Sequence, residues 1–220
     1  KKFGLLLIVP IAILGLVDDI FNIKQIYRLF LQSINVFLIT FLLLDSYNPF
    51  EIPFLSSFIP LIIFFIGLTL INVVNFMDGI DGLVAINMFL IFLNYTFTNH
   101  FDLIYIPIVL MIFLFYNWPP AKIFMGDSGS TFLGLLFFYI TFVNNDLSSS
   151  MISLLTAAPL LIDSLLCILR RIYNKENIFS PHKKHLYQRL HQKGMQHKQI
   201  SLIYGSSTSI LLLFSHTNNL

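Results

Sequence analysis

Residues 52–81 read IPFLSSFIPLIIFFIGLTLINVVNFMDGID, and this stretch decides the fold. Residues 52–74 contain no charged side chain, and these 23 residues exceed the roughly 20 that a helix needs to cross the hydrocarbon core of a bilayer. The amides and acids of Asn72–Asp81 close the stretch. We therefore predict a transmembrane helix that ends in a polar site near the membrane surface.

The rest of the chain repeats this alternation of apolar and polar segments. Of its 220 residues, 56% are hydrophobic and only 11% are charged, and the mean hydropathy is +0.80. Stretches with at most one charged residue give eight candidate spans: 3–17, 29–44, 52–74, 82–100, 103–117, 129–145, 149–169 and 201–216. The prediction is an all-α fold, a polytopic membrane helix bundle that forms a single integral-membrane domain over residues 1–220.

The basic residues predict how the bundle is oriented. Three loops contain acids but no Lys or Arg: 45–51, 98–102 and 144–150. The basic residues gather at the opposite ends of the spans: Lys24, Arg28, Lys122 and the eight from Arg170 to Lys198. By the positive-inside rule those ends face the cytoplasm, and residues 170–200 form a basic cytoplasmic loop. Lys1 and Lys2 are exceptions that would lie outside.

Asp18 and Asp19 are the first polar cluster on the predicted cytoplasmic side. They follow a short apolar run, so they are expected at the membrane interface. Two adjacent carboxylates there repel each other unless a cation or a proton compensates, which favours a functional site. A solvated helix end is the alternative.

The second cluster is the segment NVVNFMDGID. Asn72, Asn75, Asp78 and Asp81 are spaced by three, so they would line one stripe of a continuing helix. Amides and acids on one stripe are hard to explain by packing alone. The alternative is an ordinary polar loop.

The third cluster is NWPPAKIFMGDSGS, residues 117–130. The double proline stops a helix, Lys122 offers a point charge for phosphate, and Phe124 offers a flat face. Asp127 provides a hard oxygen ligand suited to Mg²⁺. Residues 128–130 open the next helix, whose amino end favours anions. A helix cap with a loop is the alternative.

The fourth cluster is the basic segment. His182, His185 and Arg189 have spacings that would place them on one helical face, where each can donate to a phosphate. The alternative is a loop that pairs with anionic lipid. Asp163, inside a span, is expected to face the bundle interior, towards Arg170.

These motifs resemble one family in order and in detail. The matching segments are GLVDD (15–19), RLFLQ (28–32), NVVNFMDGIDGL (72–83), PPAKIFMGDSGS (119–130) and SPHKKHLYQRL (180–190). They are similar to the polyprenyl-phosphate N-acetylhexosamine-1-phosphate transferases of glycosyltransferase family 4. That family includes the enzymes that use UDP-GlcNAc and phospho-N-acetylmuramoyl-pentapeptide transferase.

The resemblance implies a bacterial inner-membrane enzyme with its active site at the cytoplasmic face. Such an enzyme transfers a sugar-1-phosphate from a UDP-amino sugar to undecaprenyl phosphate and releases UMP, as the first step of O-antigen or another envelope glycan. Mg²⁺ is the implied cofactor, with Mn²⁺ as a substitute. Nucleic acid is not an expected partner, membrane lipid is, and a homodimer is left open. The family has ten spans, so the chain would lack the first two.

The resemblance also assigns roles. The predicted catalytic residues are Asp18, Asp19, Asp81, Asp127 and His185. The predicted substrate-binding residues are Asn75, Asp78, Asn117, Lys122, Phe124, His182 and Arg189. Asp127 would be the principal metal ligand, and the Asp18-Asp19 pair would lie at the lipid phosphate. Phe124 would stack on uracil beside Asn75, Asp78 and Asn117, whereas Asp81 and His185 would meet the phosphates.

One departure and three rival interpretations stand beside this assignment. The family's His-x-His-His run reads His185, Leu186, Tyr187, Gln188 here. An ion-coupled secondary transporter would need midplane acids, and only Asp163 fits. A CDP-alcohol phosphotransferase would need an Ala-Arg pair shortly after Asp78-Gly79, which is absent. The third rival is an inactive family fragment.

Overall fold

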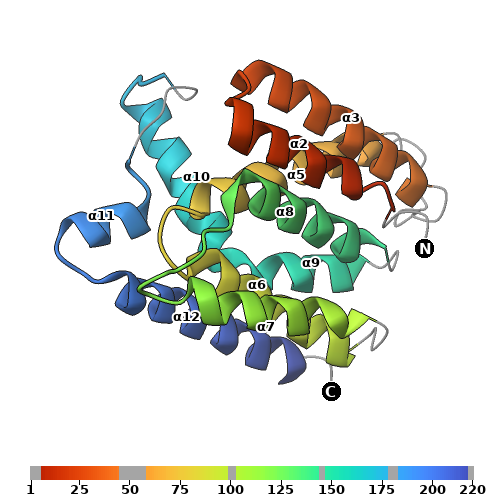
Figure 1. Cartoon of the computed structure of the whole chain (residues 1–220). Coiled ribbons are helices and arrows are strands. Elements are labelled where there is room, and N and C mark those ends of the chain that lie inside the picture. The colour runs from red at the N-terminus through yellow and green to blue at the C-terminus, as the bar shows by residue number, and fades with distance from the viewer. Residues whose placement is uncertain (1–5, 45–57, 99–102, 144–146, 178–182, 218–220) are drawn as a thin grey trace. The chain divides into compact units, whose positions relative to one another are not determined.

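The computed structural model describes residues 6–44, 58–98, 103–143, 147–177 and 183–217. The regular structure in these ranges is helical (Figure 1). The elements are α2 (Val9–Phe21), α3 (Gln25–Leu44), α5 (Ile59–Met77), α6 (Leu83–Thr98), α7 (Tyr105–Asn117), α8 (Gly126–Phe142), α9 (Leu147–Thr156), α10 (Ala158–Tyr173), α11 (Leu186–Gln192) and α12 (His197–Thr217). The predicted all-α class is confirmed for the described residues. Lys1, Lys2, His182 and most of the three base-free loops lie outside them.

Each predicted span corresponds to a helix or a pair of helices, and two differences from the prediction concern a helix break and the first pair of acids. The span predicted at 149–169 is two helices, α9 and α10, bent by 75° at a break. Pro159 lies in the first turn of α10, where it cannot donate a backbone hydrogen bond to the preceding turn, and this ends the continuous helix. The other difference concerns Asp18 and Asp19, which lie within α2 rather than after its end.

Length and apolarity separate the helices into classes. Gln25–Leu43 and Ile59–Met77 are each long and apolar enough to cross a membrane, and the bent α9–α10 pair would be a third crossing. Helices α6 and α7 are apolar but shorter. The larger number of spans stays a prediction.

The chain divides into two compact units, which we describe separately. The first comprises Lys1–Asn75 and Met125–Leu154. In it α2 packs on both α3 and α8 (Figure 1). Two glycines allow close approach of helix backbones: a Cβ at Gly15 would lie 2.3 Å from the Cα of Ser128, and one at Gly134 would lie 2.7 Å from the Cα of Ile71. Small residues are the usual means by which membrane helices pack closely.

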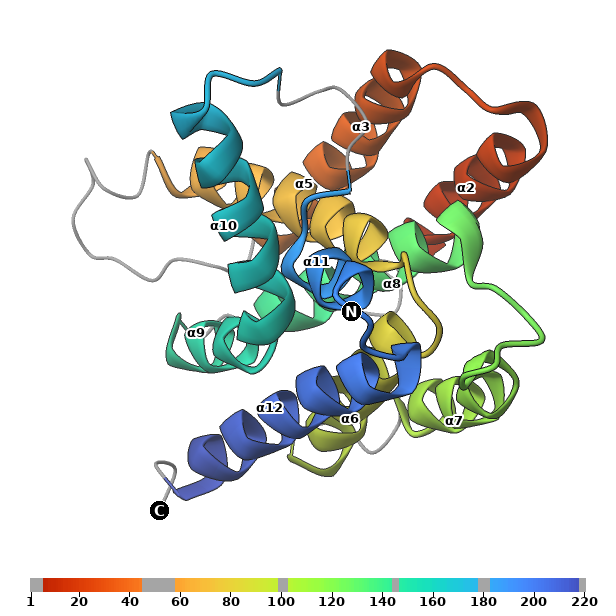
Figure 2. The same ribbon diagram turned by 90° about the vertical axis from the view of Figure 1, so that its left-hand side faces the viewer.

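The second unit comprises Phe76–Phe124 and Leu155–Leu220. In it α6 packs against α7 and α12, and the short α11 contacts α10 and α12 (Figure 2). A buried hydrogen bond of 2.6 Å from Thr208 Oγ1 to Asn87 Oδ1 joins α12 to α6. Such a bond satisfies two polar groups that would otherwise be costly inside an apolar bundle.

Candidate active site

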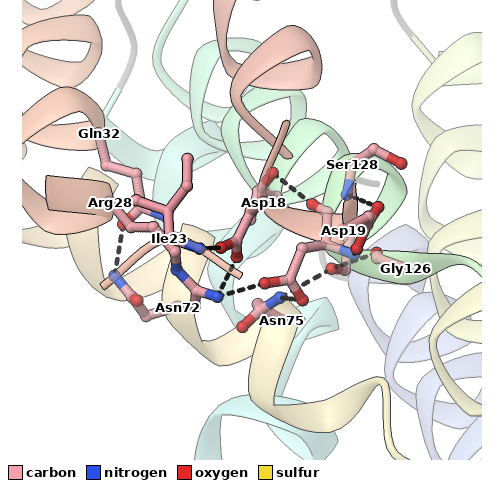
Figure 3. A network of polar contacts seen from close by, with 12 residues as sticks. Asp18, Asp19, Ile23, Arg28, Gln32, Asn72, Asn75, Gly126 and Ser128 are labelled. Carbon is pink, nitrogen blue, oxygen red and sulfur yellow. Dashed lines mark hydrogen bonds and ion pairs between the residues drawn. The ribbon is translucent and has the colours of Figure 1, made fainter. Parts of the chain in front are cut away.

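Arg28 is the centre of a polar network in the first unit (Figure 3). Its Nη1 atom forms ion pairs with Asp18 Oδ2 and with Asp127 Oδ2. The chain reverses between α2 and α3 because Asn22 adopts a left-handed conformation at φ 49° and caps α2. This reversal returns Arg28 to Asp18, whose Oδ1 also accepts from the backbone N–H of Ile23 at 2.7 Å.

Asp127 receives a second side-chain donor from α5. Asn75 Nδ2 donates to Asp127 Oδ1 at 2.8 Å and to Ser130 Oγ at 3.0 Å. Both carboxylate oxygens of Asp127 are therefore oriented by fixed donors, Asn75 on one and Arg28 on the other. The side chain is still 30% exposed, so a ligand can reach it.

Asp19 occupies the amino end of α8. Its Oδ1 accepts from the backbone N–H of Asp127 at 2.8 Å, and its Oδ2 accepts from that of Ser128 at 3.1 Å (Figure 3). The sequence predicts that this helix end favours an anion, and in the structure the anion is the side chain of Asp19. Gly126 allows the approach: its φ is +66°, and a Cβ there would lie 2.7 Å from Asp19 Oδ2.

The site includes residues to which the sequence argument gave no role. Arg28 belongs to the RLFLQ motif and to the predicted cytoplasmic bases, but its pairing with the acids was not predicted. Asn72 Nδ2 reaches Gln32 Oε1 at 3.4 Å and donates to the Leu68 carbonyl at 2.8 Å. A small pocket is lined by Leu14, Gly15, Asp18, Arg28, Gln32, Asp127 and Thr131. One feature of the sequence could have predicted the role of Arg28. It is the single basic residue in a long apolar helix, and a charge at such a position needs an acidic partner.

The donor chemistry of this network fits a divalent cation. Asp18 and Asp127 pair with Arg28, and Asp19 accepts from the backbone N–H of Asp127. The network therefore holds three carboxylates and one guanidinium, a formal charge of about −2. Within the described ranges, no group of three acid, histidine or cysteine side chains could hold a metal by itself. Mg²⁺ commonly takes one or two carboxylates and completes its shell with water and substrate phosphates. Asp127 matches that mode of binding.

In the second unit the acids after α5 lie on a turn. The helix ends at Met77, so Asp78 and Asp81 do not continue the helical stripe of Asn72 and Asn75. Asp81 Oδ2 accepts from the backbone N–H of Ala121 at 3.2 Å. These residues are placed by loop contacts rather than by helical periodicity.

The amino end of α12 also meets this turn. His197 Nδ1 lies 3.3 Å from Asp81 Oδ2, and Ser201 Oγ donates to the Asp81 carbonyl at 2.8 Å. Asp81 therefore links the turn to α12 as well as to the Ala121 loop.

The loop after α7 is shaped by Asn117. Its Oδ1 accepts from the backbone N–H of Gly82 at 3.0 Å, and its Nδ2 donates to the Ile123 carbonyl at 2.9 Å. The buried Asn117 amide thus ties two loops together. Lys122 and Phe124 project from the same loop with exposed side chains, 74% exposed for Phe124. Of these three predicted substrate-binding residues, Lys122 and Phe124 are directly accessible.

His185 precedes a helix rather than lying on it. It is the N-cap of α11 with ψ 153°, and its backbone N–H donates to Gln188 Oε1 at 3.2 Å. The prediction that His185 and Arg189 share a helical face is therefore wrong, because α11 begins one residue after His185. The imidazole is 4% exposed, with ring centroids 5.7 Å from Tyr187 and 6.3 Å from Phe76.

Tyr187 and Gln188, which replace two histidines of the family pattern, hold this segment in place. The Tyr187 ring is buried and its hydroxyl donates to the Phe76 carbonyl at 3.0 Å. Burial raises the pKa of Tyr187, and the charges of Asp163 and Asp78 raise it further, so the hydroxyl stays a donor at neutral pH. Gln188 caps α11, because its Oε1 accepts from the backbone N–H of His185.

Replacing Tyr187 with Phe is expected to lower the free energy of unfolding by about 1 kcal/mol, because the Phe76 carbonyl loses its donor. Thermal unfolding in detergent measures this. The matched control is Tyr173→Phe, whose ring is 87% exposed and whose loss of a hydroxyl should leave the midpoint unchanged. Equal shifts for both variants would contradict an anchoring role for Tyr187.

Comparison with known proteins identifies the family. The model for glycosyl transferase family 4 matches residues 3–145. The chain belongs to this family. It is 30% identical over 215 residues to the probable undecaprenyl-phosphate N-acetylglucosaminyl 1-phosphate transferase of Bacillus subtilis, covering 88% of this chain and 59% of the relative.

Two further relatives bear on the chemistry. Phospho-N-acetylmuramoyl-pentapeptide-transferase of Petrotoga mobilis is 35% identical over 162 residues, covering 61% of this chain and 50% of the relative. The undecaprenyl-phosphate alpha-N-acetylglucosaminyl 1-phosphate transferase of Thermotoga maritima is 28% identical over 211 residues, covering 93% and 67% respectively. The chain thus spans between half and two thirds of these relatives. Family membership and the apolar helices make it a membrane protein.

Proposed function

We propose that this glycosyl transferase family 4 member transfers a sugar-1-phosphate from a UDP-sugar to undecaprenyl phosphate and releases UMP. The sugar is an N-acetylated amino sugar, and the reaction takes place at the cytoplasmic face of the bacterial inner membrane. The product would initiate O-antigen or another envelope glycan. The names of two relatives support the reaction class, since both are undecaprenyl-phosphate N-acetylglucosaminyl 1-phosphate transferases.

One observation carries the proposal: Asp18 and Asp127 share the guanidinium of Arg28, while Asn75 fixes the other oxygen of Asp127. The groups come from four helices, and their mutual contacts orient the carboxylate oxygens. Preorganised charges of this kind are what phosphoryl transfer requires, because its catalysis consists mainly of positioning and charge stabilisation.

The chemical step needs little from a protein base. A lipid phosphomonoester has a second pKa near 6, so at neutral pH it is mostly a dianion and already nucleophilic. One of its oxygens attacks the phosphorus that carries the sugar, a new P–O–P bond forms, and the bond from that phosphorus to the bridging oxygen of the UDP diphosphate breaks. UMP leaves with the electron pair of the broken bond. Asp18 and Asp19 are therefore positioning groups in this proposal.

Asp127 is the proposed ligand of Mg²⁺, and Asp18 pairs with the same guanidinium, that of Arg28. When bound, Mg²⁺ would neutralise diphosphate charge that would otherwise repel the lipid dianion. Arg28 balances the carboxylates and keeps them from separating. Asn75 keeps one oxygen of Asp127 in a fixed direction.

The second unit supplies the proposed recognition of the nucleotide. The exposed ring of Phe124 is free to stack on uracil, and the exposed Lys122 can meet a phosphate. Asp78 would contact the uridine and Asp81 would support the diphosphate. Asp81 lies on a turn that is fixed by Ala121 and Ser201.

The secondary-transporter alternative depends on Asp163. Its carboxylate accepts hydrogen bonds from two backbone N–H groups and from the hydroxyl of Tyr204. An ion-coupling acid must exchange protons or ions, and three protein donors oppose this. The transferase reaction is favoured.

The direct test uses the full-length protein in proteoliposomes with undecaprenyl phosphate, Mg²⁺ and a panel of UDP-amino sugars. We expect UMP release with at least one UDP-N-acetylhexosamine, dependent on the lipid phosphate and abolished by EDTA. Restoration by Mn²⁺ tests the alternative ion. Absence of UMP with every donor, together with ion flux in the same vesicles, would support the transporter instead.

A further inference from the structure

Asp163 is a buried acid for which the proposed reaction has no use. It lies within α10 and is 3% exposed. Instead of facing Arg170, its carboxylate meets the start of α11. Oδ1 accepts from the backbone N–H of Leu186 at 2.6 Å, and Oδ2 accepts from that of Tyr187 at 3.2 Å.

A third donor comes from α12. Tyr204 Oη donates to Asp163 Oδ2 at 2.7 Å. One carboxylate therefore joins three elements of the second unit: α10, the first turn of α11 and α12. These three helices contact one another (Figure 2). The two backbone donors belong to the unpaired N–H groups that every helix has at its amino end, so the acid also interacts favourably with the dipole of α11.

The same carboxylate lies beside His185. The Nδ1 atom of the imidazole is 3.6 Å from Asp163 Oδ1, and the ring lies near those of Tyr187 and Phe76. His185 immediately precedes the two residues whose N–H groups bind Asp163. A carboxylate on the Nδ1 side orients an imidazole and directs its Nε2 atom away from that carboxylate.

We propose that Asp163 is a positioning residue: it clamps the first turn of α11 to α10 and α12, and so fixes His185 for contact with a substrate phosphate. This inference rests on the proposed function for the role of His185, but the clamp itself does not. It gives a reason for an acid inside an apolar helix, where an ionised group is retained only when it is paired or hydrogen-bonded. It also explains how a segment without the family's two further histidines keeps the remaining one in place.

The variants that test this proposal are chosen by how many of the three hydrogen bonds to Asp163 each one removes. Asp163→Ala removes all three acceptor contacts. Asp163→Asn keeps one oxygen but presents an NH₂ group to donors, so it can satisfy only part of the set. Tyr204→Phe removes only the contact from α12 and keeps the ring, so it tests the clamp if the Asp163 variants fail to fold. Tyr173→Phe, at an exposed ring on α10, is the matched control for Tyr204→Phe.

The first readout is amide hydrogen exchange of the peptide covering residues 183–192, measured on the full-length protein without substrates. We expect exchange at least tenfold faster in Asp163→Ala and severalfold faster in Tyr204→Phe, with Asp163→Asn between Asp163→Ala and wild type. Peptides from α8 should be unchanged. Unchanged protection of residues 183–192 in Asp163→Ala would overturn the clamp, whatever the activity of the protein.

The second readout separates positioning from binding. In the UMP assay we expect Tyr204→Phe to lower kcat at least fivefold while KM for the UDP-sugar stays within twofold, since the bound ground state keeps its nucleotide contacts. Tyr173→Phe should match wild type. Faster exchange with an unchanged kcat would show a clamp without a positioning role and would overturn the proposal. A wild-type protein that exchanges as expected but releases no UMP would instead refute the proposed function alone.

Discussion

Asp127→Asn is expected to lower turnover about a thousandfold at saturating Mg²⁺ while the protein stays folded. A neutral amide is a much poorer ligand for Mg²⁺ than a carboxylate, and the loss of a metal contact worth several kcal/mol in the transition state gives a change of this size. The geometry adds a second reason. Asp127 accepts from Asn75 on one oxygen and from Arg28 on the other, so an amide must turn its NH₂ group towards one of these donors.

UMP release as a function of Mg²⁺ concentration measures this effect, and thermal unfolding checks the fold. Glu176→Gln is the control, because it also exchanges a carboxylate for an amide, at an acid that pairs with Lys184 outside the network around Arg28. It should retain activity within twofold. Activity of Asp127→Asn within tenfold of wild type at saturating Mg²⁺ would mean that the metal is held elsewhere.

The helical framework was predictable because it depends on local composition. Long apolar runs must be helices where water is absent, and every predicted run corresponds to a helix or a helix pair. The break between α9 and α10 was not predicted, although Pro159 was visible. Prolines also occur inside continuous apolar helices, where neighbouring groups satisfy the freed carbonyls, so its effect depends on packing. The start of α3 was also predicted too late: the helix begins at Gln25, four residues before the predicted span 29–44.

Four residues of the network around Arg28 were predicted as site residues, but not how they pair. Asp127, Asn75 and the Asp18-Asp19 pair were chosen for their chemistry, and the first unit brings all four together. The ion pair between Arg28 and Asp127 joins residues 99 apart in the chain, a distance at which local spacing carries no information. Asp19 was expected to act beside Asp18, yet it binds the amino end of α8, because α2 passes close to that helix end.

The segment around α11 shows the limit of periodicity. A spacing of four favoured a helical face shared by His185 and Arg189, but spacing alone cannot tell where a helix begins. The position of the first turn is fixed here by Asp163, which lies 23 residues before Leu186 in the chain. The sequence shows that Asp163 is an unusual acid within an apolar span. Its hydrogen-bond partners could be identified only from the structure.

Gly15→Ala should be among the most damaging of small substitutions in this chain. A Cβ there would lie 2.3 Å from the Cα of Ser128 and 2.7 Å from the carbonyl oxygen of Asp127, and both are backbone atoms that no rotamer change can move. α2 would have to move away from α8, which separates Asp18 and Asp19 from Asp127. Overpacking costs about 1–3 kcal/mol of stability, and a misplacement of about 1 Å in a catalytic group can cost a hundredfold in rate.

Gly205→Ala is the matched control, because it is also a glycine inside a helix at a helix contact. A Cβ there would meet the side chain of Ile86, with its Cδ1 atom at 3.0 Å, and the end of a flexible side chain can move aside. We expect Gly205→Ala to keep the unfolding midpoint and the rate of UMP release near those of wild type. Gly15→Ala should lower the midpoint clearly and reduce UMP release about a hundredfold. If the two variants behaved alike, close contact between α2 and α8 would not be what holds the two parts of the acidic site together.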